Sequence, residues 1–236
     1  MTNNFKSGLK DGIPIALGYL SVSFTFGILA AASGLDAPIA ILISMTNMTS
    51  AGQLAGLNIM MAGGGVIELI LSQLVINMRY ALMSISLSQK FDSKTSRLKK
   101  SLLAFGNTDE VFAVSMSKKE DINGKYFFGL MLLPYIFWSL GTILGSLSGN
   151  ILPESIISAL SIALYAMFIA IIIPPAKRYK SVAIVILISV GFSLIFKFSP
   201  LLSQISSGFA VIIISVVSCF IGAYFFPINE EESDNE

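Results

Sequence analysis

The residues in this chain that stand out as candidates for a functional role are charged side chains inside apolar stretches. Arg79 lies within the apolar stretch 66–87, and Asp109 and Glu110 lie near the middle of the stretch 101–116. If these stretches cross a bilayer, a central charge costs at least about 2.5 to 3.5 kcal/mol, so it is a functional candidate by default. A cation and a carboxylate at similar depth would bind the two charges of a zwitterion. We therefore predict that Arg79, Asp109 and Glu110 bind substrate; the alternative is an ion pair that only fixes helix register.

The residues before the two acids predict a helix that begins inside its apolar stretch. Asn107 and Thr108 are residue types that cap helix N-termini, and carboxylates are favoured in the first turn. Adjacent side chains on a helix point about 100° apart, so at most one acid faces Arg79, and we favour Asp109. The free N–H groups of such half-helices bind substrate carboxylates in known transporters. The alternative places both acids at the membrane interface, beside a lysine-rich loop.

Neutral polar side chains could complete the shell around a substrate, and we predict this role for Asn47, Gln53 and Asn77. At 3.6 residues per turn, the predicted helix 66–87 carries polar residues on two roughly opposite stripes. One stripe holds Glu68, Ser72 and Arg79, and the other holds Gln73, Asn77, Tyr80 and Ser84. A helix that is polar on both sides is expected to lie centrally in a bundle. Glu68 lies near the outer end of the helix, where we expect it to reach water.

Composition excludes several other functions. The chain has no His and a single Cys, Cys219, so it cannot form a Ser-His-Asp triad, a His-ligated zinc site or a cysteine cluster by itself. It has no phosphate-binding glycine loop followed by Lys-Ser or Lys-Thr. The formal net charge is +1, which gives no basic excess for nucleic acid. We expect no metal, no cofactor and no catalytic activity.

About eight apolar segments must position the candidate residues. Hydrophobic residues make up 54% of the 236-residue chain and charged residues only 12%, whereas ordinary soluble domains carry about 25% charged residues. The expected fold is an all-α, polytopic membrane helical bundle surrounded by lipid, with one transporter domain over residues 1–228 and a short disordered acidic tail over 229–236. The segments run near residues 12–32, 37–62, 66–87, 101–116, 126–148, 157–173, 181–196 and 208–226.

Two of these segments are poorly suited to a continuous span. The segment 37–62 carries a run of polar residues between Ser44 and Gln53, and the segment 101–116 carries the two acids at its middle. Irregular backbone at membrane depth persists only where protein or a watery cavity surrounds it. We therefore predict that both segments are broken or re-entrant and lie inside the bundle; the alternative is a pair of ordinary helices.

The distribution of basic residues supports re-entrant segments. Three loops are rich in lysine and arginine, around Lys94, Lys119 and Arg178. Short basic loops collect on the cytoplasmic side. If the two polar segments enter and return, all three loops and both termini lie in the cytoplasm.

Glycines repeat at four-residue spacing in the segment 126–148, at Gly141 and Gly145 and again at Gly149 just beyond it. Small residues at this spacing let two helix backbones approach closely. The pattern predicts tight packing inside the bundle or against a partner, and it carries no chemistry of its own.

Four short motifs follow one another along the chain: Gly8-x5-Pro14-x3-Gly18, then Ser44-Met45 with Ala51-Gly52-Gln53, then Asn77-Met78-Arg79-Tyr80, then Thr108-Asp109-Glu110. In this order they resemble the AzlC family, over residues 8 to about 175. These proteins are large subunits of bacterial branched-chain amino acid exporters. The resemblance implies export of branched-chain or similar apolar amino acids, together with a small second membrane subunit of the AzlD type. Two positions depart from the family pattern: Ser161 stands where an Asp is expected and Tyr165 where Pro is common.

The sequence thus predicts a secondary transporter of the bacterial plasma membrane that exports small apolar amino acids. A passive channel and a receptor-like or structural membrane protein without flux remain as alternatives. An intramembrane hydrolase is a weaker alternative because the chain carries few intramembrane acids and no paired catalytic motif.

Overall fold

The computed structural model describes residues 3–149 and 153–227, and every regular element in these ranges is a helix. The all-α prediction is therefore confirmed for this part of the chain, and the acidic tail 229–236 lies outside it. The elements are α1 (Phe5–Ala32), α2 (Ala37–Thr46), α3 (Ser50–Met61), α4 (Val66–Lys90), α5 (Arg97–Leu103), η1 (Ala104–Gly106), α6 (Asp109–Met116), α7 (Gly124–Ser148), α8 (Glu154–Arg178), α9 (Lys180–Phe198), η2 (Leu202–Gln204) and α10 (Ser207–Phe225).

The helices form two compact units, which are described separately. The first comprises Met1–Leu54 and Asn77–Ser161, and the second comprises Ala55–Ile76 and Ile162–Glu236. All of the charged candidate residues lie in the first unit, because Arg79 follows Asn77 and the two acids belong to α6.

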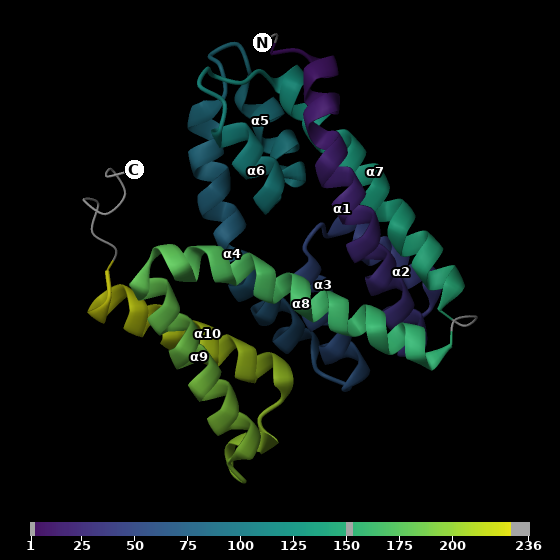
Figure 1. Ribbon diagram of the computed structural model, residues 1–236, viewed down its shortest axis with the longest axis vertical. Helices are drawn as coiled ribbons and strands as arrows, with labels where there is room; N and C mark the ends of the chain where they lie inside the picture. Colours follow the sequence, from purple (N-terminus) through teal and green to yellow (C-terminus); the bar gives the residue numbers. More distant parts are fainter. Residues whose placement is uncertain (1–2, 150–152, 228–236) are drawn as a thin grey trace. The chain divides into compact units, whose positions relative to one another are not determined.

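Close packing of α1 against α7 forms the centre of the first unit, where the two long helices run side by side (Figure 1). A Cβ atom built on Gly145 would lie 2.1 Å from the carbonyl oxygen of Phe24, and one on Gly27 would lie 2.5 Å from that of Thr142. Backbone meets backbone on both sides of this contact. The glycine repeat of the sequence is thus used inside the bundle, and the partner surface of α7 is α1.

Two predicted segments are interrupted, as expected from their polarity. The first is divided into α2 and α3 by residues 47–49, where Asn47 takes an extended conformation (φ −140°, ψ 99°) and ends α2. The second is divided into α5, η1 and α6, and Asn107 leaves helical geometry at ψ 87° before Thr108 starts α6. Both breaks therefore occur where side chains offer hydrogen bonds that compete with the helix.

The predicted count of about eight apolar segments is not confirmed. Among the described residues, five helices are long and apolar enough to cross a membrane: α1, α4, α7, α9 and α10. The pieces of the two interrupted segments are much shorter, at 12 residues or fewer. A span needs about 20 residues, so none of these pieces crosses a bilayer alone.

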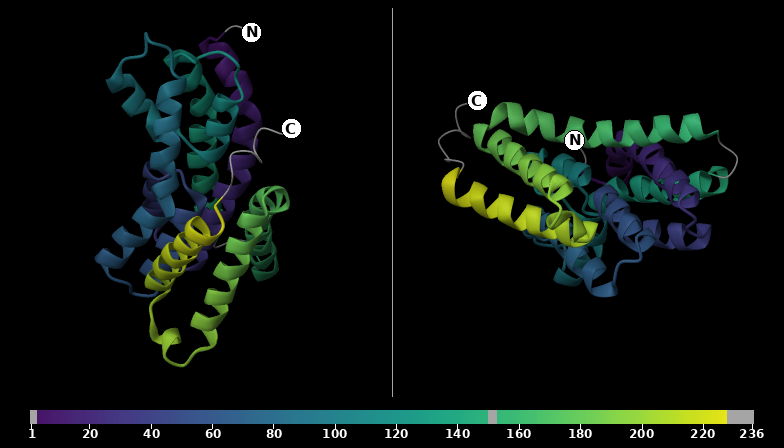
Figure 2. Two further views of the ribbon diagram at one scale, coloured as in Figure 1. Left: turned by 90° about the vertical axis from the view of Figure 1, so that its left-hand side faces the viewer. Right: turned by 90° about the horizontal axis from the view of Figure 1, so that it is seen from below.

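In the second unit, α9 and α10 lie side by side, as both views in Figure 2 show. The start of α10 is held by Glu68 of α4, whose carboxylate accepts hydrogen bonds from the Ser206 hydroxyl (2.5 Å) and the Gly208 N–H (2.9 Å). Glu68 is only 5% exposed. The expectation that it reaches water was wrong, because the donors at a helix N-terminus satisfy the carboxylate instead.

Candidate functional site

An ion pair joins α4 to the start of α6. The guanidinium of Arg79 lies 2.7 Å from a carboxylate oxygen of Asp109, and the two side chains are 47% and 36% exposed. Asp109 is thus the acid that faces Arg79. The rest of the chain therefore leaves both charged groups partly uncovered.

Glu110 turns to a different partner. Its carboxylate accepts a short hydrogen bond from the hydroxyl of Tyr19 on α1, and the side chain of Thr108 also interacts with that hydroxyl. Tyr19 is 8% exposed and packs edge-on against Trp138 of α7, with ring centres 5.1 Å apart. The two adjacent acids therefore point in different directions, as the helix geometry predicts, and they tie α6 to α4 and to α1.

Tyr80 brings the two interruptions together. The Arg79 guanidinium donates a hydrogen bond to the Tyr80 hydroxyl (3.2 Å) and lies over its ring, 4.9 Å from the centre. The same hydroxyl interacts with the side chain of Thr49, at the break between α2 and α3. Arg79 and Tyr80 were placed on different stripes, but the long arginine side chain bends back to its neighbour. Both breaks thus converge on Arg79.

The start of α6 is fixed by side chains of the first unit. The hydroxyl of Thr108 accepts a hydrogen bond from the N–H of Val111 (3.5 Å), as an N-cap residue does. Asn107, 4% exposed, donates its amide to Ser84 of α4 (3.1 Å), and its side-chain oxygen has no hydrogen-bond donor within the described residues. Val111, in the same turn as the two acids, is fully buried in the core, so the first turn of α6 is also packed against the core.

Residues 14–152 match the family described as AzlC protein. This match covers more than half of the chain. The chain belongs to the AzlC family.

Three relatives are similar to this chain over about three quarters of its length. An uncharacterised membrane protein of Archaeoglobus fulgidus is 34% identical over 175 residues, which are 73% of this chain and 76% of the relative. The inner membrane protein YgaZ of Escherichia coli is 27% identical over 187 residues, 76% of each chain. The branched-chain amino acid transport protein AzlC of Bacillus subtilis is 25% identical over 179 residues, 75% of this chain and 69% of the relative. No solved structure matches significantly.

The AzlC match ends at residue 152, so it excludes α8. The two positions that depart from the family pattern, Ser161 and Tyr165, both belong to α8. The two motifs that supply the ion pair, Asn77-Met78-Arg79-Tyr80 and Thr108-Asp109-Glu110, lie inside the matched range.

The other three predicted site residues of this AzlC-family protein are the amides Gln53, Asn47 and Asn77. Gln53, 1% exposed, donates to Ser44 (2.5 Å), whose oxygen lies 2.6 Å from that of Thr142. Asn47 ends α2, and Asn77 precedes Arg79 by two residues on α4, about 200° around the helix. A substrate-binding role for these three amides stays a prediction.

Sequence reasoning missed Tyr19 as a neighbour of the acids and did not choose Tyr80. Both belong to or adjoin the family motifs: Tyr80 ends Asn77-Met78-Arg79-Tyr80, and Tyr19 directly follows Gly18. A buried phenol needs a partner for its hydroxyl, and this rule could have marked the two tyrosines as partners for intramembrane charges.

Proposed function

We propose that this chain is the large subunit of a secondary transporter that exports branched-chain or similar apolar amino acids across the bacterial plasma membrane. It would act as one transporter domain over residues 1–228, with a small AzlD-type membrane subunit. The observation that carries the proposal is the partly exposed Arg79–Asp109 pair at the start of α6. The name of the Bacillus subtilis relative, a branched-chain amino acid transport protein, supports the choice of substrate.

An ion pair of this kind matches the charges of an amino acid. The substrate carboxylate would bind Arg79, where the planar guanidinium offers two parallel donors. The substrate ammonium would bind Asp109. Two protein–substrate pairs then replace one internal pair, so the site remains neutral whether it is empty or occupied. A neutral site avoids the cost of leaving an unpaired charge away from water.

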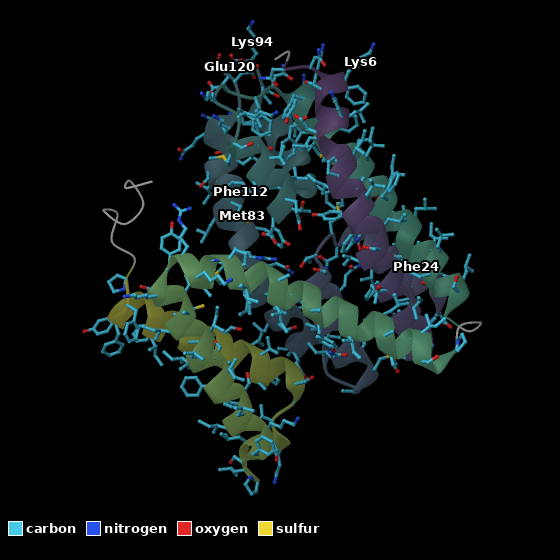
Figure 3. The ribbon with its side chains drawn as sticks, in the orientation of Figure 1. Lys6, Phe24, Met83, Lys94, Phe112 and Glu120 are labelled. Atoms are coloured by element: carbon cyan, nitrogen blue, oxygen red, sulfur yellow. The ribbon has the colours of Figure 1, made fainter. Side chains whose placement is uncertain are left out.

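Apolar side chains next to the pair would hold the substrate side chain. Met83 follows Arg79 by four residues on α4, and Phe112 follows Asp109 by three residues on α6. Residues at these spacings share a helix face, so both lie one turn beyond the charges. Figure 3 labels the two residues in the same part of the first unit. The charged groups Arg79 and Asp109 would bind the substrate's backbone charges, and Met83 and Phe112 would lie beside its side chain. This arrangement favours an amino acid with an apolar side chain over one with a polar side chain.

Counterflow tests the proposed function directly. Proteoliposomes containing the chain and its candidate small subunit are loaded with unlabelled leucine, and uptake of labelled leucine, valine and methionine is followed. A transporter is expected to accumulate label transiently. Methionine is included because apolar side chains of similar volume differ little in transfer energy.

Each rival function gives a different result in that assay. A passive channel would equilibrate label without a transient excess, and its conductance would not depend on an ion gradient. A receptor-like or structural protein would give no flux with or without the small subunit. Unchanged leucine, valine and methionine pools in cells that overproduce both subunits would overturn the substrate assignment.

Asp109→Asn is expected to impair transport more than Glu110→Gln. The first change removes the charge that faces Arg79, whereas the second leaves the ion pair and replaces an acceptor of the Tyr19 hydroxyl with another acceptor. Truncating one member of a buried charge pair at a protein–protein interface costs about 2 to 5 kcal/mol, and a smaller cost is expected for this partly exposed pair. Initial counterflow rates of the two variants, normalised to folded protein, check this order; the reverse order would make Glu110 the site acid.

We also propose that both termini and the basic loops around Lys94, Lys119 and Arg178 lie in the cytoplasm. Cys219, an exposed and unpaired cysteine, would first be changed to Ser. Single cysteines in each loop are then expected to resist an impermeant thiol reagent in intact cells and to react in opened membranes. Labelling of any one loop from outside would contradict this topology.

A further inference from the structure

A cavity in the first unit has an apolar wall and a basic rim. It has a volume of about 810 Å³ and lies between α5, the start of α7 and the first residue of α1. Phe5, Leu102 and Phe128 contribute to the apolar wall, and Lys94, Lys99 and Lys125 contribute to the rim. None of these residues belongs to the ion-pair site around Arg79.

The three rim lysines have no carboxylate partner within the described residues. Ion pairs there are limited to Arg79–Asp109 and Lys118–Asp11. Asp92 also lines the cavity, but its carboxylate accepts hydrogen bonds from the N–H and hydroxyl of Thr95 (3.0 and 2.6 Å). Three lysines and one carboxylate therefore line the cavity without an ion pair between them, which leaves a net charge of +2. Such a rim is complementary to an anion.

The position of the cavity points to the level of lipid headgroups. Phe5 is the first residue of α1, and Lys125 and Phe128 belong to the first turns of α7. Both helices are long and apolar enough to span a membrane. Their ends therefore lie near the boundary between water and hydrocarbon. Figure 3 labels Lys94 at the end of the first unit that also carries Lys6.

Exposed apolar side chains continue from the cavity wall. Leu102 is 66% exposed and Leu98, one turn earlier on α5, is 71% exposed; Phe128 on α7 is 44% exposed. An acyl chain would cover these side chains, whereas a small soluble anion would leave them uncovered. The exposed apolar area beside the lysines thus favours a lipid over a free anion as the occupant.

We propose that this cavity binds an anionic phospholipid. The phosphate would lie among Lys94, Lys99 and Lys125, and the acyl chains would lie along Leu102 and Phe128. Basic pockets of this type beside transmembrane helices bind acidic headgroups in other membrane proteins. The inference does not depend on which substrate the protein transports.

Lipid binding can be measured on the purified full-length chain in a neutral detergent. Phosphatidylglycerol, phosphatidylcholine or inorganic phosphate is titrated into the protein. Native mass spectrometry measures the number of bound lipid molecules, and the midpoint of thermal unfolding is measured in parallel. The wild type is expected to retain phosphatidylglycerol in preference to phosphatidylcholine and to ignore inorganic phosphate. The triple variant K94Q/K99Q/K125Q is expected to bind phosphatidylglycerol at least tenfold more weakly.

A matched control separates the cavity from general surface charge. The triple variant K6Q/K10Q/K119Q removes the same charge from exposed lysines of the first unit outside this cavity and is expected to change affinity less than twofold. Equal effects of the two triple variants would overturn the site. If inorganic phosphate stabilises the protein, the cavity binds a soluble anion and the lipid proposal is wrong. If phosphatidylglycerol and phosphatidylcholine are retained equally, the cavity is only an apolar surface without preference for an anionic headgroup, and the proposal is also wrong. If the first triple variant does not fold, L102Q/F128Q must lose phosphatidylglycerol binding for the proposal to stand.

Discussion

Arg79→Gln is expected to reduce amino acid counterflow by at least about 100-fold, a difference of about 2.7 kcal/mol. The change removes the donor proposed for the substrate carboxylate and leaves Asp109 without its cation. Folded protein should still reach the membrane, because buried Val111 and the hydrogen bond between Tyr19 and Glu110 still hold α6 in place. Transport per folded molecule in proteoliposomes measures the effect.

Two companion variants sharpen that experiment. Arg97→Gln removes an exposed arginine at the start of α5 and is expected to leave transport unchanged. Arg79→Lys keeps the charge but loses the planar two-donor geometry, so it should recover only part of the rate. Wild-type kinetics in Arg79→Gln would show that the pair is structural or interfacial, and the polar stretch from Ser44 to Gln53 would then become the better candidate.

Gly145→Ala is expected to remove most of the folded protein from the membrane. A single methyl group at this position would lie 2.1 Å from the Phe24 carbonyl oxygen, and backbone cannot rotate away as a side chain can. Separating α1 from α7 by even a few tenths of an ångström disturbs the whole central contact. Overpacking of this kind costs about 1 to 3 kcal/mol or more. Fluorescence-detected size-exclusion chromatography of detergent extracts measures the folded fraction.

Gly18→Ala is the matched control for Gly145→Ala. Gly18 also lies within a long helix, but a Cβ atom built on it meets nothing within 4 Å. Alanine is favoured over glycine in a helix by about 1 kcal/mol, so this variant should be as stable as the wild type or slightly more stable. If both variants behave alike, the close contact between α1 and α7 is not what holds the first unit together.

The interruptions were predictable because their causes are local in sequence. Thr108 caps α6 through an N–H only three residues away, and Asp109 and Glu110 favour that helix start through charge. The four-residue spacing of the glycines likewise predicts a close contact between two helices. Polarity and spacing thus identified the break before α6, the break after α2 and the packing face of α7.

The partners of the charged residues required the fold. Tyr19 and Glu110 are 91 residues apart in sequence, and no local pattern links them. Glu68 was misjudged for the same reason, since its donors at Ser206 and Gly208 come from the far end of the chain. The count of about eight apolar segments is not confirmed, since five helices among the described residues are long and apolar enough to cross a membrane.

The buried polar side chains between α3 and α1 form a row of hydrogen bonds with one order of donors and acceptors. Gln53 donates to Ser44, and Thr142 donates to the carbonyl oxygen of Ser23 (3.3 Å). The Ser44 hydroxyl therefore donates its hydrogen bond to the Thr142 hydroxyl, 2.6 Å away. Each group in this row donates to the next, and the last acceptor is the carbonyl oxygen of Ser23. If the Gln53 amide flipped so that its oxygen faced Ser44, both hydroxyls would have to reorient as well. The orientation of the Gln53 amide on α3 is thereby linked to a backbone oxygen on α1, through Ser44 on α2 and Thr142 on α7.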